Sequence, residues 1–214
     1  MTMTKRLFAH CLLMLAVFFT PVAAFAAGEV LPPDELVRSV TDEVLTIVRD
    51  DSAIQAGDTG KVFALVDEKV LPHFDFRRMT SLAVGRDWRS ASQEQQERII
   101  TAFRILLVRT YSNAITQYRD KTIEVKPLRG GFDEKNTRVS TEVRLPGAQP
   151  IPIDYSLAKG DKGWKVFDVI VAGVSLVTNY RSSFAEEISA KGIDGLIDSM
   201  EAKNRSLEAG QGGK

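Results

Sequence analysis

Apolar residues recur at helical spacing in the first half of the chain. Between residues 36 and 48 they follow one another in steps of three and four, after the run Pro32-Pro33-Asp34, which is typical of the start of a helix. A second, shorter helix is expected over residues 61–70, because Pro72 disfavours helical backbone just before it. This half of the chain is therefore predicted to be helical.

The longest amphipathic pattern covers residues 92–118. Ser92 and Gln95 have the spacing of a capping box, in which each side chain accepts a hydrogen bond from the other residue's backbone N–H. The apolar stripe of this helix is wider than contact with one sheet requires. It comprises Ile99, Ile100, Phe103, Leu106, Leu107, Tyr111, Ile115 and Tyr118.

Apolar and polar residues alternate between residues 121 and 170, as they do in β-strands. Four strands are expected, around residues 123–125, 139–145, 151–157 and 164–171. The last is apolar on both faces, which favours a central position. Short turns between the strands predict an antiparallel four-stranded sheet covered by helices, an α+β fold. Helices are expected again over residues 176–189 and 192–203. Residues 209–214 are expected to form a flexible end.

The first 26 residues have the layout of a secretory signal peptide. Lys5 and Arg6 precede an apolar run over residues 11–19, and Ala24-Phe25-Ala26 offers a small-x-small cleavage site. The run is shorter than the about 20 residues of a membrane-spanning helix, which argues against the alternative of an uncleaved anchor. We therefore expect a signal peptide (1–26), a linker (27–33), one domain (34–203) and a flexible tail (204–214).

Composition narrows the chemistry that the exported chain can perform. Cys11 is the only cysteine and lies in the signal segment, which excludes disulfides, thiol catalysis and cysteine-ligated metals from the mature protein. The whole chain has 28 Lys and Arg and 28 Asp and Glu; without Lys5 and Arg6 the net charge becomes −2. That balance argues against a nucleic-acid partner.

Candidate catalytic and cofactor-binding residues are few. His73 is the only histidine outside the signal segment, so a histidine metal site or a catalytic triad lacks partners. A structural or surface position is expected for His73, with pH sensing as the alternative. Neither of the phosphate-binding patterns GxxxxGK[ST] and GxGxxG occurs. No cofactor and no metal are therefore expected.

An acid and a tyrosine in one cavity would suggest a proton-transfer enzyme, and Asp154, Tyr155 and Asp168 invite that reading. However, successive residues of a strand point to opposite faces of the sheet, so Asp154 and Tyr155 cannot share a cavity. The enzyme reading is therefore the weaker one.

Two blocks of residues, in this order and separation, resemble those of a known family. The first is LPHFDF (residues 71–76), followed by VGRDW (residues 84–88); the second is GWKVFDVIVAGVSLVTNYRSSF (residues 163–184). Over roughly residues 33–203 the chain resembles the MlaC family, also called the toluene-tolerance family of periplasmic phospholipid-binding proteins.

The resemblance implies a fold similar to the nuclear-transport-factor-2-like α+β cone, extended by helices. It also implies a periplasmic shuttle whose cargo is glycerophospholipid, with residues 34–203 as the phospholipid-binding domain. The implied partners are an outer-membrane lipoprotein complex and the substrate-binding component of an inner-membrane ABC transporter. A carrier of another lipid, such as a hopanoid, stays open as the alternative.

A lipid carrier needs a large apolar cavity, because two acyl chains hold on the order of 30 CH₂ groups, each worth about 0.8 kcal/mol when removed from water. By pattern alone, apolar faces are usually packed core; under the resemblance they become candidate cavity lining. The candidate lipid-binding residues are Phe74, Phe76, Leu82, Phe103, Leu106, Leu107, Tyr111, Val143, Ile153, Tyr155, Val166, Val169 and Val171.

A few other positions are expected to support the fold. Asp75 is expected to cap the helix that follows it. Gly85 and Gly173 are expected to permit turns. Arg144 and Arg181 are expected to meet either a phosphate, a partner carboxylate or a surface ion pair.

Overall fold

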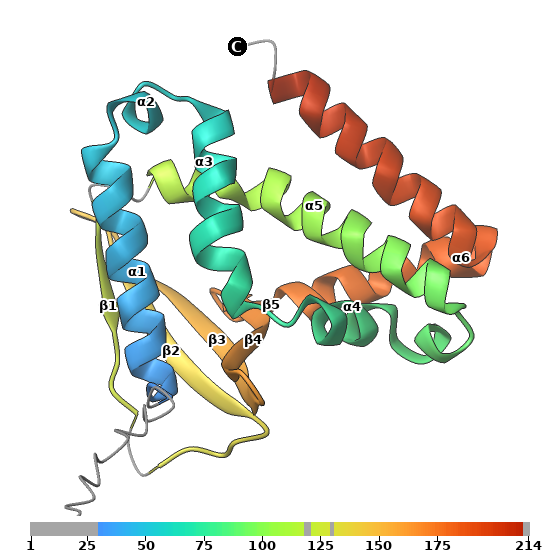
Figure 1. Cartoon of the computed structure of the whole chain (residues 1–214), viewed down its shortest axis with the longest axis horizontal. Helices are drawn as coiled ribbons and strands as arrows, with labels where there is room; N and C mark the ends of the chain where they lie inside the picture. Colours follow the sequence, from blue (N-terminus) through green and yellow to red (C-terminus); the bar gives the residue numbers. More distant parts are fainter. Residues whose placement is uncertain (1–29, 118–120, 129–130, 212–214) are drawn as a thin grey trace, which may run out of the picture.

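The structure, a computed structural model, describes residues 30–117, 121–128 and 131–211. The expected signal peptide and residues 27–29 of the expected linker lie outside the described residues. Figure 1 shows a curved sheet with helix α1 (Pro33–Asp50) lying across one face, and a group of helices extending away from the sheet. This is the α+β architecture that the alternation of helical and strand patterns predicts.

The sheet is antiparallel throughout, in the order β1-β2-β3-β4-β5. Its first four strands are β1 (Thr122–Val125), β2 (Thr137–Arg144), β3 (Ile151–Gly160) and β4 (Gly163–Val171). Val143 pairs with Ile151 and Tyr155 pairs with Val169, so apolar residues of neighbouring strands share one face. The meander predicted from the sequence is confirmed.

The prediction of four strands is wrong, because a fifth short strand follows. Strand β5 (Val174–Ser175) turns back onto β4 and pairs Val171 with Val174. Ala172 and Gly173 make this turn with φ values of 49° and 84°. Glycine adopts such a φ without steric cost, which confirms the turn expected at Gly173. Two residues are too few to show an alternating pattern, so this strand could not be predicted from the sequence.

Six helical segments follow α1 before the long helix. They are α2 (Ser52–Gln55), α3 (Thr59–Leu65), the π-helical η1 (Val66–Val70), the 3₁₀-helical η2 (Leu71–His73), α4 (Phe76–Val84) and η3 (Gly85–Arg89). The helix predicted over residues 61–70 is therefore α-helical only to Leu65. Its last turn widens before Pro72, the residue expected to end it.

Helix α1 is joined to the nearest strand by side chains on its outer surface. Arg38 Nη2 donates to the carbonyl of Val125 at 2.8 Å, and Arg49 Nη2 donates to the carbonyl of Lys121 at 3.3 Å. Both carbonyls lie at the ends of β1, so α1 is fixed along the first edge of the sheet.

Helix α5 (Gln93–Gln117) begins with the predicted capping box. The backbone N–H of Ser92 donates to Gln95 Oε1 at 2.9 Å, and the backbone N–H of Gln95 donates to Ser92 Oγ at 3.2 Å. The predicted end at Tyr118 lies outside the described residues.

Helix α6 (Leu176–Gln211) contains a kink at Gly192, whose φ of 74° separates two helical stretches, as the sequence predicts. The second stretch continues past Lys203, where the sequence suggested an end. Asn204 explains the extension, because its side chain is buried and Nδ2 donates to the Ala102 carbonyl of α5 at 2.9 Å. Within residues 30–117 and 131–211, no helix is long and apolar enough to cross a membrane.

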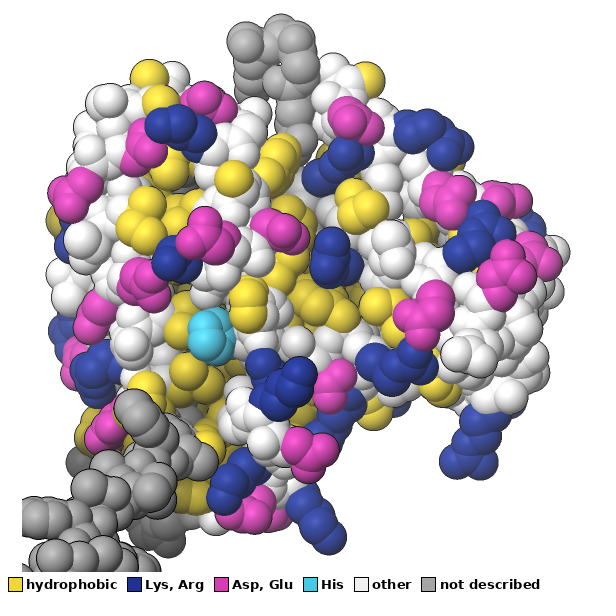
Figure 2. Space-filling model, in the orientation of Figure 1, with side chains coloured by type: hydrophobic (Ala, Val, Ile, Leu, Met, Phe, Trp, Pro, Cys, Tyr) yellow, Lys and Arg dark blue, Asp and Glu magenta, His cyan; other side chains and the backbone are white. Residues whose placement is uncertain are grey.

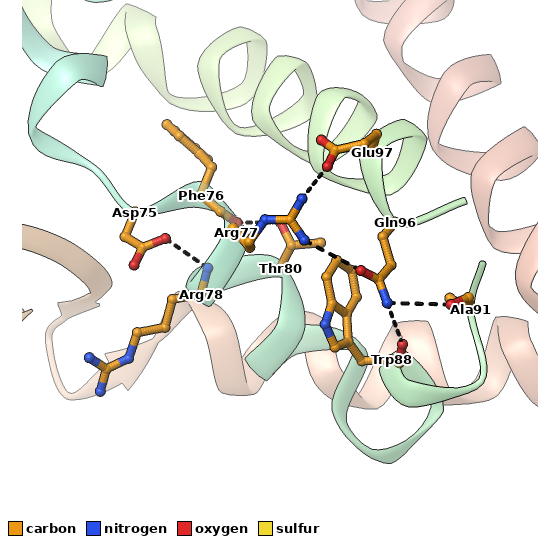
Figure 3. A network of polar contacts seen from close by, with 9 residues as sticks. All are labelled: Asp75, Phe76, Arg77, Arg78, Thr80, Trp88, Ala91, Gln96 and Glu97. Atoms are coloured by element: carbon orange, nitrogen blue, oxygen red, sulfur yellow. Dashed lines mark hydrogen bonds and ion pairs between the residues drawn. The ribbon is translucent and has the colours of Figure 1, made fainter. Parts of the chain in front are cut away.

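A polar network joins the start of α4 to the start of α5 (Figure 3). Arg77 forms an ion pair with Glu97, and its Nη1 donates to Gln96 Oε1 at 3.3 Å. Gln96 Nε2 in turn donates to the carbonyls of Trp88 and Ala91, at 3.1 and 3.3 Å. The loop between α4 and α5 is therefore held by hydrogen bonds to the side chain of Gln96, which in turn contacts Arg77 of α4.

Candidate functional site

An apolar cavity of about 600 Å³ lies between the inner face of the sheet and the helices that cover it. Its walls come from α1, η1, η2, α4, α5, the sheet and the first residues of α6. Figure 2 shows one side of the molecule, with hydrophobic side chains along a hollow in its middle and charged side chains around the hollow. A cavity of this size falls in the range of small-molecule sites.

Ten of the thirteen residues predicted to line a cavity do lie on its wall. They come from four regions: the segment that leads into α4 together with its first residue, helix α5, the inner face of β2 and β3, and β4. They are Phe74, Phe76, Leu107, Tyr111, Val143, Ile153, Tyr155, Val166, Val169 and Val171.

The other three, Leu82, Phe103 and Leu106, do not line the cavity. They pack in the core between α4, α5 and α6. Phe103 contacts the ring of Tyr180 at a centroid distance of 5.0 Å, edge to face. The reason is geometric: α5 packs against α6 with one side and against the cavity with the other, so its wide stripe serves two surfaces.

Sequence reasoning missed the contribution of α1 and single residues of several other elements. The apolar stripe of α1 was recognised but not assigned to the cavity. The residues that it supplies are Leu36, Val37, Val40, Thr41, Val44 and Leu45. The other residues missed are Val66, Val70, Leu71, His73, Met79, Val108, Ser112, Ile123, Val174, Leu176 and Asn179.

The LPHFDF block runs alongside β4 and places aromatic rings in the cavity. The backbone N–H of Asp75 donates to the carbonyl of Val166 at 2.8 Å, and Phe74 forms a parallel bridge with Val166. Asp75 also caps α4, as predicted, by accepting the backbone N–H of Arg78 at 2.9 Å. Phe74 and Phe76 thereby stack at 5.7 Å.

The sequence model of the MlaC protein family matches residues 38–202. The chain belongs to the MlaC family. That membership confirms the resemblance expected from the LPHFDF and GWKVFDVIVAGVSL blocks.

Relatives of this MlaC-family chain cover most of its length. The intermembrane phospholipid transport system binding protein MlaC of Haemophilus influenzae is 25% identical over 201 residues, 92% of each chain. The toluene tolerance protein ttg2D of Pseudomonas putida is 26% identical over 184 residues, 86% of this chain and 83% of its own.

A solved structure is similar to this MlaC-family chain as well. It is a phospholipid-binding protein from Ralstonia solanacearum in complex with a phospholipid. The two chains are 36% identical and superpose with a TM-score of 0.77, over 83% of this chain and 99% of that one.

The phenol of Tyr155 in the wall of the MlaC-family cavity is bonded within the protein. The hydroxyl of Tyr155 is hydrogen-bonded to Thr141, and burial raises the pKa of this phenol. Thr141 Oγ1 donates to the carbonyl of Ile153 at 2.9 Å. Asp154 lies on the opposite face, 4.0 Å from Arg138, which confirms that it does not share the cavity with Tyr155.

One rim of the cavity, beside η2, carries charged groups. His73 is half-buried there, and burial together with the nearby Lys165 ammonium lowers its pKa, while Glu43 on α1 acts in the opposite direction. Glu43 is itself held by Lys69, at 2.9 Å. The wall is therefore apolar inside and charged at this edge.

Asp168 and Ser175, both within the second family block (residues 163–184), fix the start of α6 against β4. Asp168 Oδ1 accepts the backbone N–H of Val177 at 3.1 Å, and Asp168 Oδ2 accepts the hydroxyl of Ser175 at 2.6 Å. This aspartate therefore supports the helix rather than facing the cavity.

The two arginines considered for phosphate binding lie away from the cavity wall. Arg144 forms an ion pair with Glu124 on the outer face of β1 and β2, and this contact lowers the pKa of Glu124. Arg181 Nε donates to the carbonyl of Leu82 at 2.9 Å. Within the part of the chain that the structure describes, no group of His, Cys, Asp and Glu side chains could hold a metal ion.

Proposed function

We propose that this MlaC-family protein is a periplasmic lipid carrier that holds glycerophospholipid acyl chains in the apolar cavity. It would move the lipid between an outer-membrane lipoprotein complex and the substrate-binding component of an inner-membrane ABC transporter. The observation that carries the proposal is the wall of the cavity, which is mainly aliphatic and aromatic and contains no carboxylate, lysine or arginine among the described residues. The relatives' names and the phospholipid complex of the Ralstonia solanacearum protein support it.

Energetics favour such a cavity over a polar one. Two acyl chains leave a bilayer only if their burial, on the order of 20 kcal/mol, is replaced by comparable apolar surface. An unpaired polar group in the wall would oppose this, because burying it without a partner costs roughly 1–3 kcal/mol. The Tyr155–Thr141 bond removes that cost at one of the polar positions of the wall.

Mass spectrometry of organic extracts from the purified protein tests the proposal. Copurified glycerophospholipid is the expected result. A polycyclic lipid such as a hopanoid in its place would support the alternative cargo, and consistent absence of any lipid would contradict the carrier function.

The expected compartment has a separate test. N-terminal sequencing of the exported protein should begin at or near Ala27, because the small-x-small site ends at Ala26. An intact Met1 on the exported protein would contradict it. The similarity to the nuclear-transport-factor-2-like cone stays a prediction, as does the division into linker, domain and tail. No residue is proposed as catalytic.

A further inference from the structure

The rim of the cavity beside η2 combines an apolar wall with positive charge. Among the described residues that line the cavity, His73 is the one basic side chain. It is half-buried, with the apolar wall on one side and the molecular surface on the other. An amphiphile whose tails filled the cavity would have its polar part at such a rim.

Lys165 of β4 does not line the cavity, but its side chain brings a second cation next to His73. Its Nζ donates to the carbonyl of Pro72, the residue before His73. An ammonium group has three N–H donors, so this bond leaves two of them available. Lys165 is close enough to His73 to lower the pKa of the imidazole.

The charge of Lys165 is not neutralised within the described part of the chain, where no carboxylate lies within 4.0 Å of its Nζ. Lys69, the neighbouring lysine of η1, differs in this respect. It contacts Glu43 at 2.9 Å and Glu68 at 3.2 Å. The rim therefore has one compensated lysine and one that can still take an anion.

We propose that His73 and Lys165 bind the phosphate of the phospholipid whose acyl chains fill the cavity. The proposal rests on the carrier function proposed above. The ammonium and the imidazole N–H would donate to two oxygens of the phosphodiester, and hydrogen bonds between ionised groups are about twice as strong as neutral ones. Inorganic phosphate offers the same oxygens, so the test separates the two sources.

A bound phosphate would reverse the electrostatic environment of His73. In the lipid-free protein the groups that act on the imidazole are Lys165 from β4 and Glu43 from α1, and Glu43 is paired with Lys69 from η1. An anion between His73 and Lys165 favours the imidazolium form, and the pKa of His73 then rises.

Imidazole NMR on the delipidated protein measures this rise directly. The chain contains His10 and His73, and the His73→Gln variant assigns the signal. The titration is repeated with phosphatidylglycerol vesicles, with diacylglycerol of the same acyl chains, and with inorganic phosphate. We expect the pKa of His73 to rise with phosphatidylglycerol and not with diacylglycerol, which fills the cavity without a phosphate.

The other outcomes have distinct meanings. If both lipids bind and the pKa of His73 is the same with each, the phosphate lies elsewhere: the proposal is overturned while the carrier function stands. If neither lipid binds, the carrier function itself fails. If inorganic phosphate alone raises the pKa as far as the lipid does, the rim is a site for free anions and the assignment to the lipid is overturned.

Variants supply a second measurement that does not depend on the imidazole. Lys165→Gln should weaken binding of phosphatidylglycerol relative to diacylglycerol by about tenfold, the effect of one charge-assisted hydrogen bond. The matched control is Lys203→Gln, which removes the same charge from an exposed position on α6 and should leave the ratio unchanged. Equal weakening of both lipids by Lys165→Gln would make Lys165 a support for η2 alone and would contradict the proposal.

Discussion

Neighbouring residues of β3 face opposite environments, and this alternation decides what each side chain does. Ile153 and Tyr155 point into the cavity, whereas Asp154 between them lies near Arg138 on the other face. A change of one position along the strand therefore separates the cavity wall from a surface ion pair. Substitutions at Ile153 and at Asp154 therefore test the cavity wall and the outer face separately within the same strand.

Ile153→Asp should abolish lipid occupancy. The variant places a carboxylate in the apolar wall, where an unpaired charge costs more than the roughly 1–3 kcal/mol of an unpaired neutral polar group. Native mass spectrometry of the folded protein measures the occupancy. The control Ile153→Leu keeps apolarity and volume and should retain lipid. Full occupancy in the aspartate variant would mean that the cavity is not where the acyl chains lie.

The stability of the lipid-free protein should fall as the pH falls through the range of His73. The fold lowers the pKa of this group below its ordinary 6.5, so the unfolded chain takes up the proton first. The stability is fully present above pH 6.5 and is lost toward the lower folded pKa. Urea unfolding at about pH 7.5 and about pH 5.5 measures the loss, and His73→Gln should reduce it.

The acids with lowered pKa do not interfere in this window. Asp51, Glu124 and Glu187 start from ordinary pKa values of 3.8, 4.5 and 4.5, so their contribution is lost only at lower pH. An identical pH dependence in His73→Gln and the unchanged protein would show that the pKa of His73 is not lowered by folding.

At the next scale, the elements are held in place by a few side chains at their ends. Asp168 joins β4 to the start of α6, Asp75 joins β4 to the start of α4, and Arg77 joins α4 to α5. The two aspartates act at helix N-termini, where backbone N–H groups lack partners within the helix, whereas Arg77 contacts the side chains of Glu97 and Gln96.

Asp168→Ala should destabilise the protein by about 1–2 kcal/mol, because it removes the acceptor for the Val177 N–H and the Ser175 hydroxyl. Chemical denaturation measures the free energy of unfolding. Asp168→Asn keeps one acceptor oxygen and should lose less. If the two variants are equally destabilised, the negative charge and not the cap accounts for the effect.

Local patterns predicted the elements well, and tertiary pairing explains what they missed. The capping box at Ser92, the turn at Gly173 and the break at Gly192 depend on nearby residues, and the structure confirms each. Which side of a stripe faces the cavity depends on partners far along the chain. Phe103 and Leu107 are both apolar and both buried on α5, yet only Leu107 reaches the cavity.

At the scale of the whole molecule, the cavity is lined by almost every element. Side chains from α1, α5 and all five strands line it and leave a volume of about 600 Å³ between them. Interiors of folded proteins are normally close-packed. A bound lipid would therefore complete the packing of the fold.

Removal of the lipid should consequently lower the melting temperature. A ligand that binds only the folded state stabilises it by about 2.7 kcal/mol at a free concentration of one hundred times its Kd. Differential scanning calorimetry before and after delipidation measures the change, and added phospholipid should restore it. Equal melting temperatures in the two states would mean that the cavity does not contribute to stability through its cargo.

The short first strand has a consequence for self-association. An open strand edge is a template for pairing with another copy, and proteins block it with short strands and charges. β1 has four residues; α1 occupies the carbonyls at its two ends through Arg38 and Arg49, and Glu124 and Arg144 pair on its outer face. Two copies that met through the edge of β1 would have to displace the two arginine contacts. Pairing of two copies through this edge is therefore disfavoured.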